Sequence, residues 1–202
     1  AWQKVSGALT GADLSSATVL ATASTVPRNL GTRFGDYVNI NDFGLARDGV
    51  TDDSARVLVA VNAAIAKTGK LYVPAGGPIL LAGSAQVTLS SISLFGDGLT
   101  DLGYPYGHIG SQFWITDTQK SPFYLNSNIT IDGIVFFYPN QIDQPSAPIV
   151  YPPLFTSAPS TGQVVMLTIT NCQITNAYDV LTIPEKVVCG DVVIANNRIC
   201  AV

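Results

Sequence analysis

The chain has 202 residues, of which 47% are hydrophobic and only 12% are charged, and its formal net charge is −4. This composition excludes an intrinsically disordered chain, which is rich in charge and poor in apolar residues. The acidic balance offers no basic surface for nucleic acid, and no apolar run approaches the roughly 18 residues that a bilayer-spanning helix needs. We therefore expect a folded protein that binds neither nucleic acid nor membrane.

Residues 1–36 are rich in Ala, Ser, Thr and Gly and show neither helical nor strand periodicity. Such a composition is typical of an extended arm or linker, so we expect no hydrophobic core in this region. We assign residues 37–202 to a second region. Because the chain stops at residues 196–202 inside what looks like a repeat, we expect it to be the N-terminal part of a longer polypeptide, truncated at its C-terminal end.

A helix is predicted over residues 53–67, where apolar side chains recur at intervals of three and four. Thr51 or Asp52 can act as the N-cap, because its side-chain oxygen can accept a backbone N–H of the first turn. Gly69 can end the helix in the left-handed conformation. The predicted apolar stripe consists of Val57, Leu58, Val61, Ala64 and Ile65.

After residue 78 the pattern changes to short β-branched strands between turns, and an internal repeat emerges. Residues 167–174 match residues 192–199 position by position, and residues 129–134 fit the same template. Because alternate side chains of a strand share one face, we expect stacked coils that bury each other's apolar faces. The expected inward column consists of Ile129, Ile169 and Ile194, and Asn171 and Asn196 are expected to stack at a corner, each amide bonding the next turn.

Two interruptions of the repeat are predicted to be loops, residues 101–113 and residues 139–159, and the second holds half of the chain's 12 prolines. Proline lacks the N–H that a strand ladder needs, so the second segment cannot be a central strand. The alternative to stacked coils is a β-sandwich, but hairpin signals such as Asn-Gly between strands are absent. The cysteines have no C-x-x-C spacing, which predicts buried free thiols rather than disulfides or a zinc site: Cys172, Cys189 and Cys200.

Residues 38–55, VNINDFGLARDGVTDDSA, resemble the opening signature of the pectate-lyase superfamily, a D-F-G-A-x-x-D-G-x-x-D-D segment before an alanine-rich helix. Leu45 takes the place of the usual Ala. Residues 71–76, LYVPAG, look like the strand that follows that helix, and residues 23–36 resemble a linker common in phage tail proteins. The resemblance implies an all-β fold, a right-handed parallel β-helix (solenoid) with an N-terminal capping α-helix and an extended N-terminal arm, of the bacteriophage tail spike or tail fibre type.

This resemblance implies a receptor-binding protein of the virion tail, extracellular when it acts on the host. Its expected roles are virion attachment, trimerisation, and recognition or degradation of host surface polysaccharide. The expected partners are two further copies in a homotrimer, other virion tail proteins bound through the N-terminal arm, and the polysaccharide itself. Two alternatives stay open, a non-catalytic virion structural or adaptor protein and a secreted polysaccharide lyase of the same superfamily.

The family's enzymes are polysaccharide lyases or glycoside hydrolases, and hydrolysis needs two carboxylates about 5–9 Å apart. No such pair emerges from the sequence, so we name no catalytic residue and expect this fragment alone to do no chemistry. No cofactor and no metal site is expected, since Asp42, Asp48, Asp52 and Asp53 lack calcium-loop spacing and suit turns and caps. Because aromatic faces stack on sugar rings, the candidate substrate-binding residues are Tyr104, Tyr106, His108 and Trp114.

Overall fold

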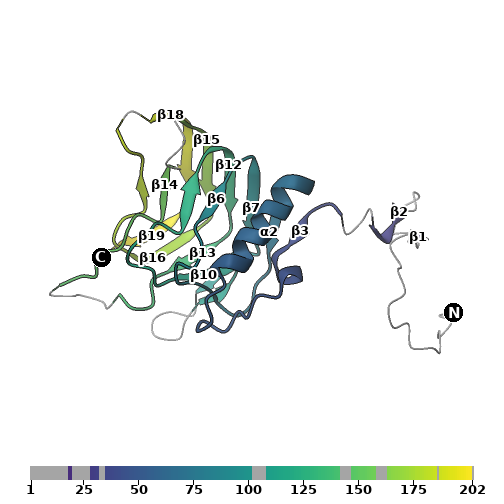
Figure 1. Ribbon diagram of the computed structural model, residues 1–202, viewed down its shortest axis with the longest axis horizontal. Helices are drawn as coiled ribbons and strands as arrows, with labels where there is room; N and C mark the ends of the chain where they lie inside the picture. Colours follow the sequence, from purple (N-terminus) through teal and green to yellow (C-terminus); the bar gives the residue numbers. More distant parts are fainter. Residues whose placement is uncertain are drawn as a thin grey trace. The chain divides into compact units, whose positions relative to one another are not determined.

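Figure 1 shows the computed structural model, which describes residues 18–19, 28–31, 35–101, 108–141, 147–157, 163–185 and 187–201. The chain divides into two units, Ala1–Asp36 and Tyr37–Val202. In the first unit, strand β1 (Thr18–Val19) pairs antiparallel with β2 (Arg28–Asn29). No helix among the described residues is long and apolar enough to cross a membrane. All further description concerns the second unit.

The described part of the second unit is mostly β and forms three parallel sheets, which the chain visits in rotation. The six-stranded sheet holds β3 (Val38–Asn39), β4 (Lys70–Val73), β7 (Ile92–Gly96), β12 (Ser127–Asp132), β15 (Gln163–Thr170) and β18 (Val188–Ala195). The five-stranded sheet holds β5 (Ile79–Leu81), β10 (Gln112–Ile115), β13 (Val135–Phe137), β16 (Gln173–Ala177) and β19 (Arg198–Ala201). The four-stranded sheet holds β6 (Val87–Leu89), β11 (Phe123–Leu125), β14 (Phe155–Ser157) and β17 (Leu181–Thr182). Each coil therefore gives one strand to each sheet, as the internal repeat predicts, and the β-sandwich alternative is wrong.

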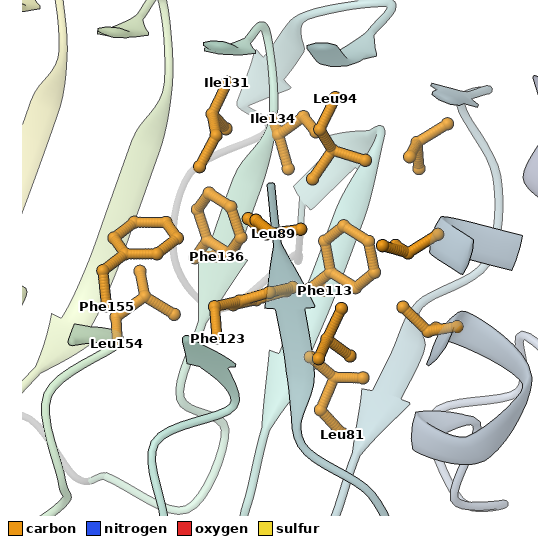
Figure 2. Packing of buried hydrophobic residues seen from close by; sticks show 14 of the residues in the cluster. Leu81, Leu89, Leu94, Phe113, Phe123, Ile131, Ile134, Phe136, Leu154 and Phe155 are labelled. Carbon is orange, nitrogen blue, oxygen red and sulfur yellow. The ribbon is translucent and has the colours of Figure 1, made fainter. Parts of the chain in front are cut away.

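The space between the three sheets is filled by inward side chains from all of them (Figure 2). The rings of Phe113 and Phe136, on neighbouring strands of the five-stranded sheet, are stacked with centroids 5.9 Å apart. Phe123 from the four-stranded sheet meets Phe136 edge-on at 5.8 Å. All three rings are fully buried. Since offset and edge-on aromatic pairs add to the stabilisation from burial alone, they help to hold successive coils together.

The predicted pairing of inward residues between coils is correct for Ile169 with Ile194 and wrong for Ile129 with Ile169. Ile169 pairs with Ile194 on one side and with Ile131 on the other, whereas Ile129 pairs with Leu167. Ile129 lies on the same buried face, two residues out of register. Alternate residues of a strand share a face, so the alternating pattern fits both registers equally well.

Ile194 is in the expected column but is not buried. Its side chain is 47% exposed, while Ile169 one coil earlier is 1% exposed. The reason is position: β18 is the outermost strand of its sheet in the described structure, so no further strand covers that side. Val192 and Ile199 are exposed for the same reason.

At the corners of the coils, residues in the left-handed conformation stack from coil to coil in two columns. One column contains Gly133, Asn171 and Asn196, which directly follow β12, β15 and β18 respectively. These are residue types that adopt positive φ at low cost. The second column contains Ser91, Asn128, Met166 and Asp191, just before or within β7, β12, β15 and β18.

Side-chain amides bond across the first of these corners, partly as predicted. The Asn171 amide donates to Asp132 Oδ1 of the preceding coil at 2.7 Å. In the next coil, however, Asn197 rather than Asn196 makes the link: its Oδ1 accepts from the Cys172 N–H and its Nδ2 donates to the Ile169 carbonyl, both at 2.8 Å. In that coil the bonded residue therefore lies one position further on than predicted.

The predicted helix is present as α2 (Ser54–Lys67) and packs against β3, β4, β6 and the short helix η1 (Ile40–Phe43). Its N-cap is Asp53 rather than Thr51 or Asp52, although Asp52 Oδ1 does accept the Ser54 N–H. The buried face is rotated from the prediction: small alanines face the sheets, and Ile65 is 36% exposed. That face consists of Ser54, Val57, Ala60, Val61 and Ala64. Gly69 follows at φ 67°, as predicted.

Both predicted loops contain strands. Segment 101–113 includes β9 (His108–Gly110), which pairs antiparallel with β8 (Leu99–Asp101), and the start of β10. Segment 139–159 ends in β14, where the chain rejoins the four-stranded sheet, and its Tyr151 is buried. None of these strand residues is proline, so each keeps the backbone N–H that pairing needs.

The three cysteines are free, but only Cys172 is buried. Burial raises the pKa of its thiol to about 11, which keeps it protonated at neutral pH. Cys189 and Cys200 are exposed, against the prediction, because they lie on the outermost strands β18 and β19.

Candidate functional site

The acidic signature before α2 is occupied by backbone and side-chain donors rather than arranged around a cation. Asp53 is fully buried, and its carboxylate accepts the N–H groups of Ala46 and Arg47 at 2.9 and 3.0 Å, with Arg56 Nη1 at 3.4 Å. The guanidinium of Arg47 donates in turn to the carbonyls of Pro74 and Gly77 at 2.8 and 3.0 Å. These bonds tie the segment before the helix to the strand after it.

Asp48 and Asp52 are bonded in a similar way. Asp48 accepts the N–H groups of Val50 and Thr51, and these bonds lower its pKa. Burial alone would raise the pKa of Asp52, but bonds from Ser54, Ser84 and Ala82 outweigh burial and hold that pKa well below its ordinary value. Among the described residues no cluster of three or more His, Cys, Asp or Glu side chains is placed to hold a metal ion.

Of the four candidate sugar-binding residues, only Trp114 has a described side chain. Tyr104 and Tyr106 lie outside the described residues, and His108 is located only as the first residue of β9. Trp114 is on strand β10, not on a loop, and is half-buried on the outer face of the five-stranded sheet. Its indole N–H donates to Gln112 Oε1 at 3.0 Å, and its ring meets Phe137 edge-on at 5.6 Å.

A second aromatic group lies on the outer face of the six-stranded sheet. Tyr72 on β4 and Phe95 on β7 are Cα partners, and their rings are stacked with centroids 5.3 Å apart and planes at 28°. Tyr37 meets both rings edge-on, at 5.3 and 5.9 Å, and is 40% exposed. We call these three residues the aromatic row.

Carboxylates flank the aromatic row. The Tyr72 hydroxyl donates to Asp97 Oδ1 at 2.5 Å, and Asp97 Oδ2 accepts the Ala75 N–H at 2.6 Å. These bonds lower the pKa of Asp97, and the bond to Asp97 raises the pKa of Tyr72 to about 12. On the other side, Asp132 is the Cα partner of Phe95. Its Oδ1 accepts from Thr170 Oγ1 at 2.8 Å.

Beside the aromatic row the same face is hollowed. The hollow has a volume of about 310 Å³ and is lined by Gly69, Ser91, Ile92, Ser93, Asn128 and Thr130. Ser93 and Thr130 are Cα partners on β7 and β12, two residues before Phe95 and Asp132 in the chain. Stacked coils thus place a hydroxyl-lined depression next to aromatic rings and carboxylates. Surfaces that combine these groups suit ligands with both apolar and hydroxyl faces.

The sequence reasoning missed this face. Tyr72 and Phe95 belong to separate coils, so no local cluster of aromatic residues marks them. The sequence signal that could have found them is strand alternation, which points both side chains outward. Tyr72 stands between two buried residues of β4, and Phe95 directly follows a buried residue of β7. Aligning the coils would have placed them side by side.

Comparison with known proteins shows the fold and no more. No protein-family model matches the chain, and no curated protein sequence matches it. Among solved structures it is similar to ORF18 of Geobacillus virus E2, with 18% identity over 73% of this chain and 28% of that one and a TM-score of 0.47. It is also similar to the A-module of the mannuronan C-5 epimerase AlgE6 of Azotobacter vinelandii, with 19% identity over 80% of this chain and 44% of that one and a TM-score of 0.50. The chain thus spans less than half the length of either, and the second similarity indicates a shared mostly-β fold with parallel sheets.

Proposed function

We propose that this chain is the N-terminal part of a bacteriophage tail spike or tail fibre, a right-handed parallel β-helix that recognises host surface polysaccharide. The observation that carries the recognition role is the outer face of the six-stranded sheet. There the aromatic row, the carboxylates of Asp97 and Asp132, and the hydroxyl-lined hollow lie together. This combination of groups suits hydroxyl-rich ligands with apolar ring faces.

The assignment to a phage tail rests on the sequence resemblance of residues 23–36 and 38–55. In this proposal α2 caps the β-helix, residues 1–36 contact other tail proteins, three copies form a homotrimer, and the protein lies in the virion tail. Degradation of the polysaccharide belongs to coils outside this chain.

A non-catalytic role in the virion is the second candidate. The bonding of the acids at the corners favours it: Asp132 is bonded to Thr170 and Asn171, and Asp179 accepts from Thr182 Oγ1. A carboxylate whose oxygen is held by neighbouring side chains in this way serves the structure of the corner.

The test uses the full-length protein and a panel of purified bacterial capsular polysaccharides and lipopolysaccharides. Binding is measured by biolayer interferometry, and released oligosaccharides are measured by mass spectrometry. We expect saturable binding to at least one polysaccharide. Release of oligosaccharides by the full-length protein, and none by residues 1–202, would favour the degrading tail spike. Binding without release would favour the non-catalytic candidate, and absence of binding across the panel would contradict the recognition role.

A further inference from the structure

The hollow on the outer face of β7 and β12 exists because small or left-handed residues surround it. Gly69 has no side chain, and Ser91 and Asn128 are in the left-handed conformation, with φ of 50° and 57°. The hollow's volume of about 310 Å³ is at the lower end of the range for small-molecule sites, roughly 300–1,000 Å³. A hollow of this volume can accept one small unit of a larger ligand.

The walls of the hollow carry hydrogen-bonding groups that the protein leaves available. The hydroxyls of Ser91, Ser93 and Thr130 and the amide of Asn128 have no side-chain hydrogen bond within the described part of the chain. Hydroxyls and amides can each donate and accept. None of the lining residues is charged. This chemistry matches a neutral ligand that presents several hydroxyl groups.

No aromatic residue lines the hollow, but Phe95 lies next to it on the same face. Phe95 follows Ser93 by two residues on the same strand and face, a separation of about 7 Å, and is stacked on Tyr72. A sugar ring has hydroxyls around its edge and an apolar C–H face, so it can bond the hollow while it contacts an aromatic ring.

The charged residues beside the hollow have opposite signs. Lys70 is the Cα partner of Ser93 on one side, and Asp132 is the Cα partner of Phe95 on the other. Asp132 lies two residues beyond Thr130 and Asp97 lies four residues beyond Ser93, so both carboxylates are further from the hollow along the chain than Lys70, which is beside Ser93. The lining itself is uncharged and offers no ion-pair partner, which favours a neutral ligand unit over a charged one.

We propose that this hollow is a subsite for one unit of a neutral, hydroxyl-rich glycan, bound with its hydroxyls towards Ser93, Asn128 and Thr130 and its apolar face towards Phe95. The inference rests on the proposed role in polysaccharide recognition, and it adds the location and the charge class of the ligand.

The experiment applies the full-length protein to a microarray of neutral and acidic bacterial oligosaccharides. Two variants fill the hollow, Ser93→Gln and Thr130→Gln, and Thr88→Gln on the outer face of β6 is the matched control. We expect the unmodified protein to select neutral glycans, both filling variants to lose at least tenfold in affinity, and the control to match the unmodified protein.

A second readout needs no variant. Bound neutral glycan should slow reductive methylation of Lys70, at the rim of the hollow, and leave Lys120, between β10 and β11, unaffected. Binding that survives both filling variants, or that leaves Lys70 unprotected, would overturn this subsite while the recognition role stands. Selection of acidic glycans would overturn the charge class. Absence of any glycan binding would overturn the subsite and the proposed function together.

Discussion

The stacked-coil arrangement predicts that the same isoleucine-to-alanine substitution lowers the free energy of unfolding much more in an inner coil than in the outermost one. Ile169 on β15 is covered by Ile131 on one side and Ile194 on the other, and is 1% exposed. Ile169→Ala therefore leaves a cavity between two coils, and such changes cost about 2–5 kcal/mol. Ile194 has a neighbour on one side only and is 47% exposed. Full burial of such a side chain is worth about 1.5–3 kcal/mol, so Ile194→Ala should cost roughly 1 kcal/mol.

Urea unfolding followed by far-UV circular dichroism measures both costs. Thr168→Ala is the control, because Thr168 is the outward neighbour of Ile169 on the same strand. Its cost should stay below about 1 kcal/mol, as is usual for surface changes. The reasoning is refuted if Ile169→Ala is no more costly than this control, or if Ile194→Ala costs as much as Ile169→Ala.

Three further predictions concern the helix signature and the corners. Asp53→Ala should destabilise the protein by roughly 3 kcal/mol or more, because it leaves the N–H groups of Ala46 and Arg47 without an acceptor; a urea midpoint equal to that of the unmodified protein would contradict this. Because folding lowers the pKa of Asp52, its ionised carboxylate stabilises the fold at pH values above 3.8, the ordinary pKa of this group. This contribution is lost as the pH falls through the folded-state pKa. The stability advantage over Asp52→Asn should accordingly shrink below pH 3.8, and an advantage that grows on acidification would show the sign to be wrong. Met166→Asn should stabilise the protein by up to about 1 kcal/mol, because Met166 is exposed and held at φ 56°; thermal unfolding with no rise in midpoint would count against strain there.

The sequence was sufficient for the repeat but not for its register. The pairing of Ile169 with Ile194 follows from two segments that match position by position, corner included. The expected register differs at Ile129 because the alternating strand pattern fits both registers, and only the left-handed corner residue distinguishes them. Aligning Gly133 with Asn171, both left-handed, would have put Ile131 opposite Ile169.

The helix α2 was predictable to within one residue because Gly69 and the apolar spacing mark it locally. Its buried face was less predictable, since which side meets the sheets depends on tertiary packing. Close contact with the strands favours Ala60 and Ala64 there and leaves the larger Ile65 partly exposed. Residue size, and not hydrophobicity alone, decides that choice.

The outer face of the six-stranded sheet was out of reach of local patterns for a related reason. Tyr72 and Phe95 are neighbours only through the pairing of β4 with β7, and Ser93 and Thr130 only through the pairing of β7 with β12. A site assembled across coils becomes visible only after the coils are in register.

The most direct test of recognition through this face is a structure of the full-length protein with a bound neutral oligosaccharide, determined by crystallography or cryo-electron microscopy. Our account predicts ligand density over β7 and β12, with a sugar ring in the hollow beside Phe95. Density confined to the Trp114 face of the five-stranded sheet would contradict it.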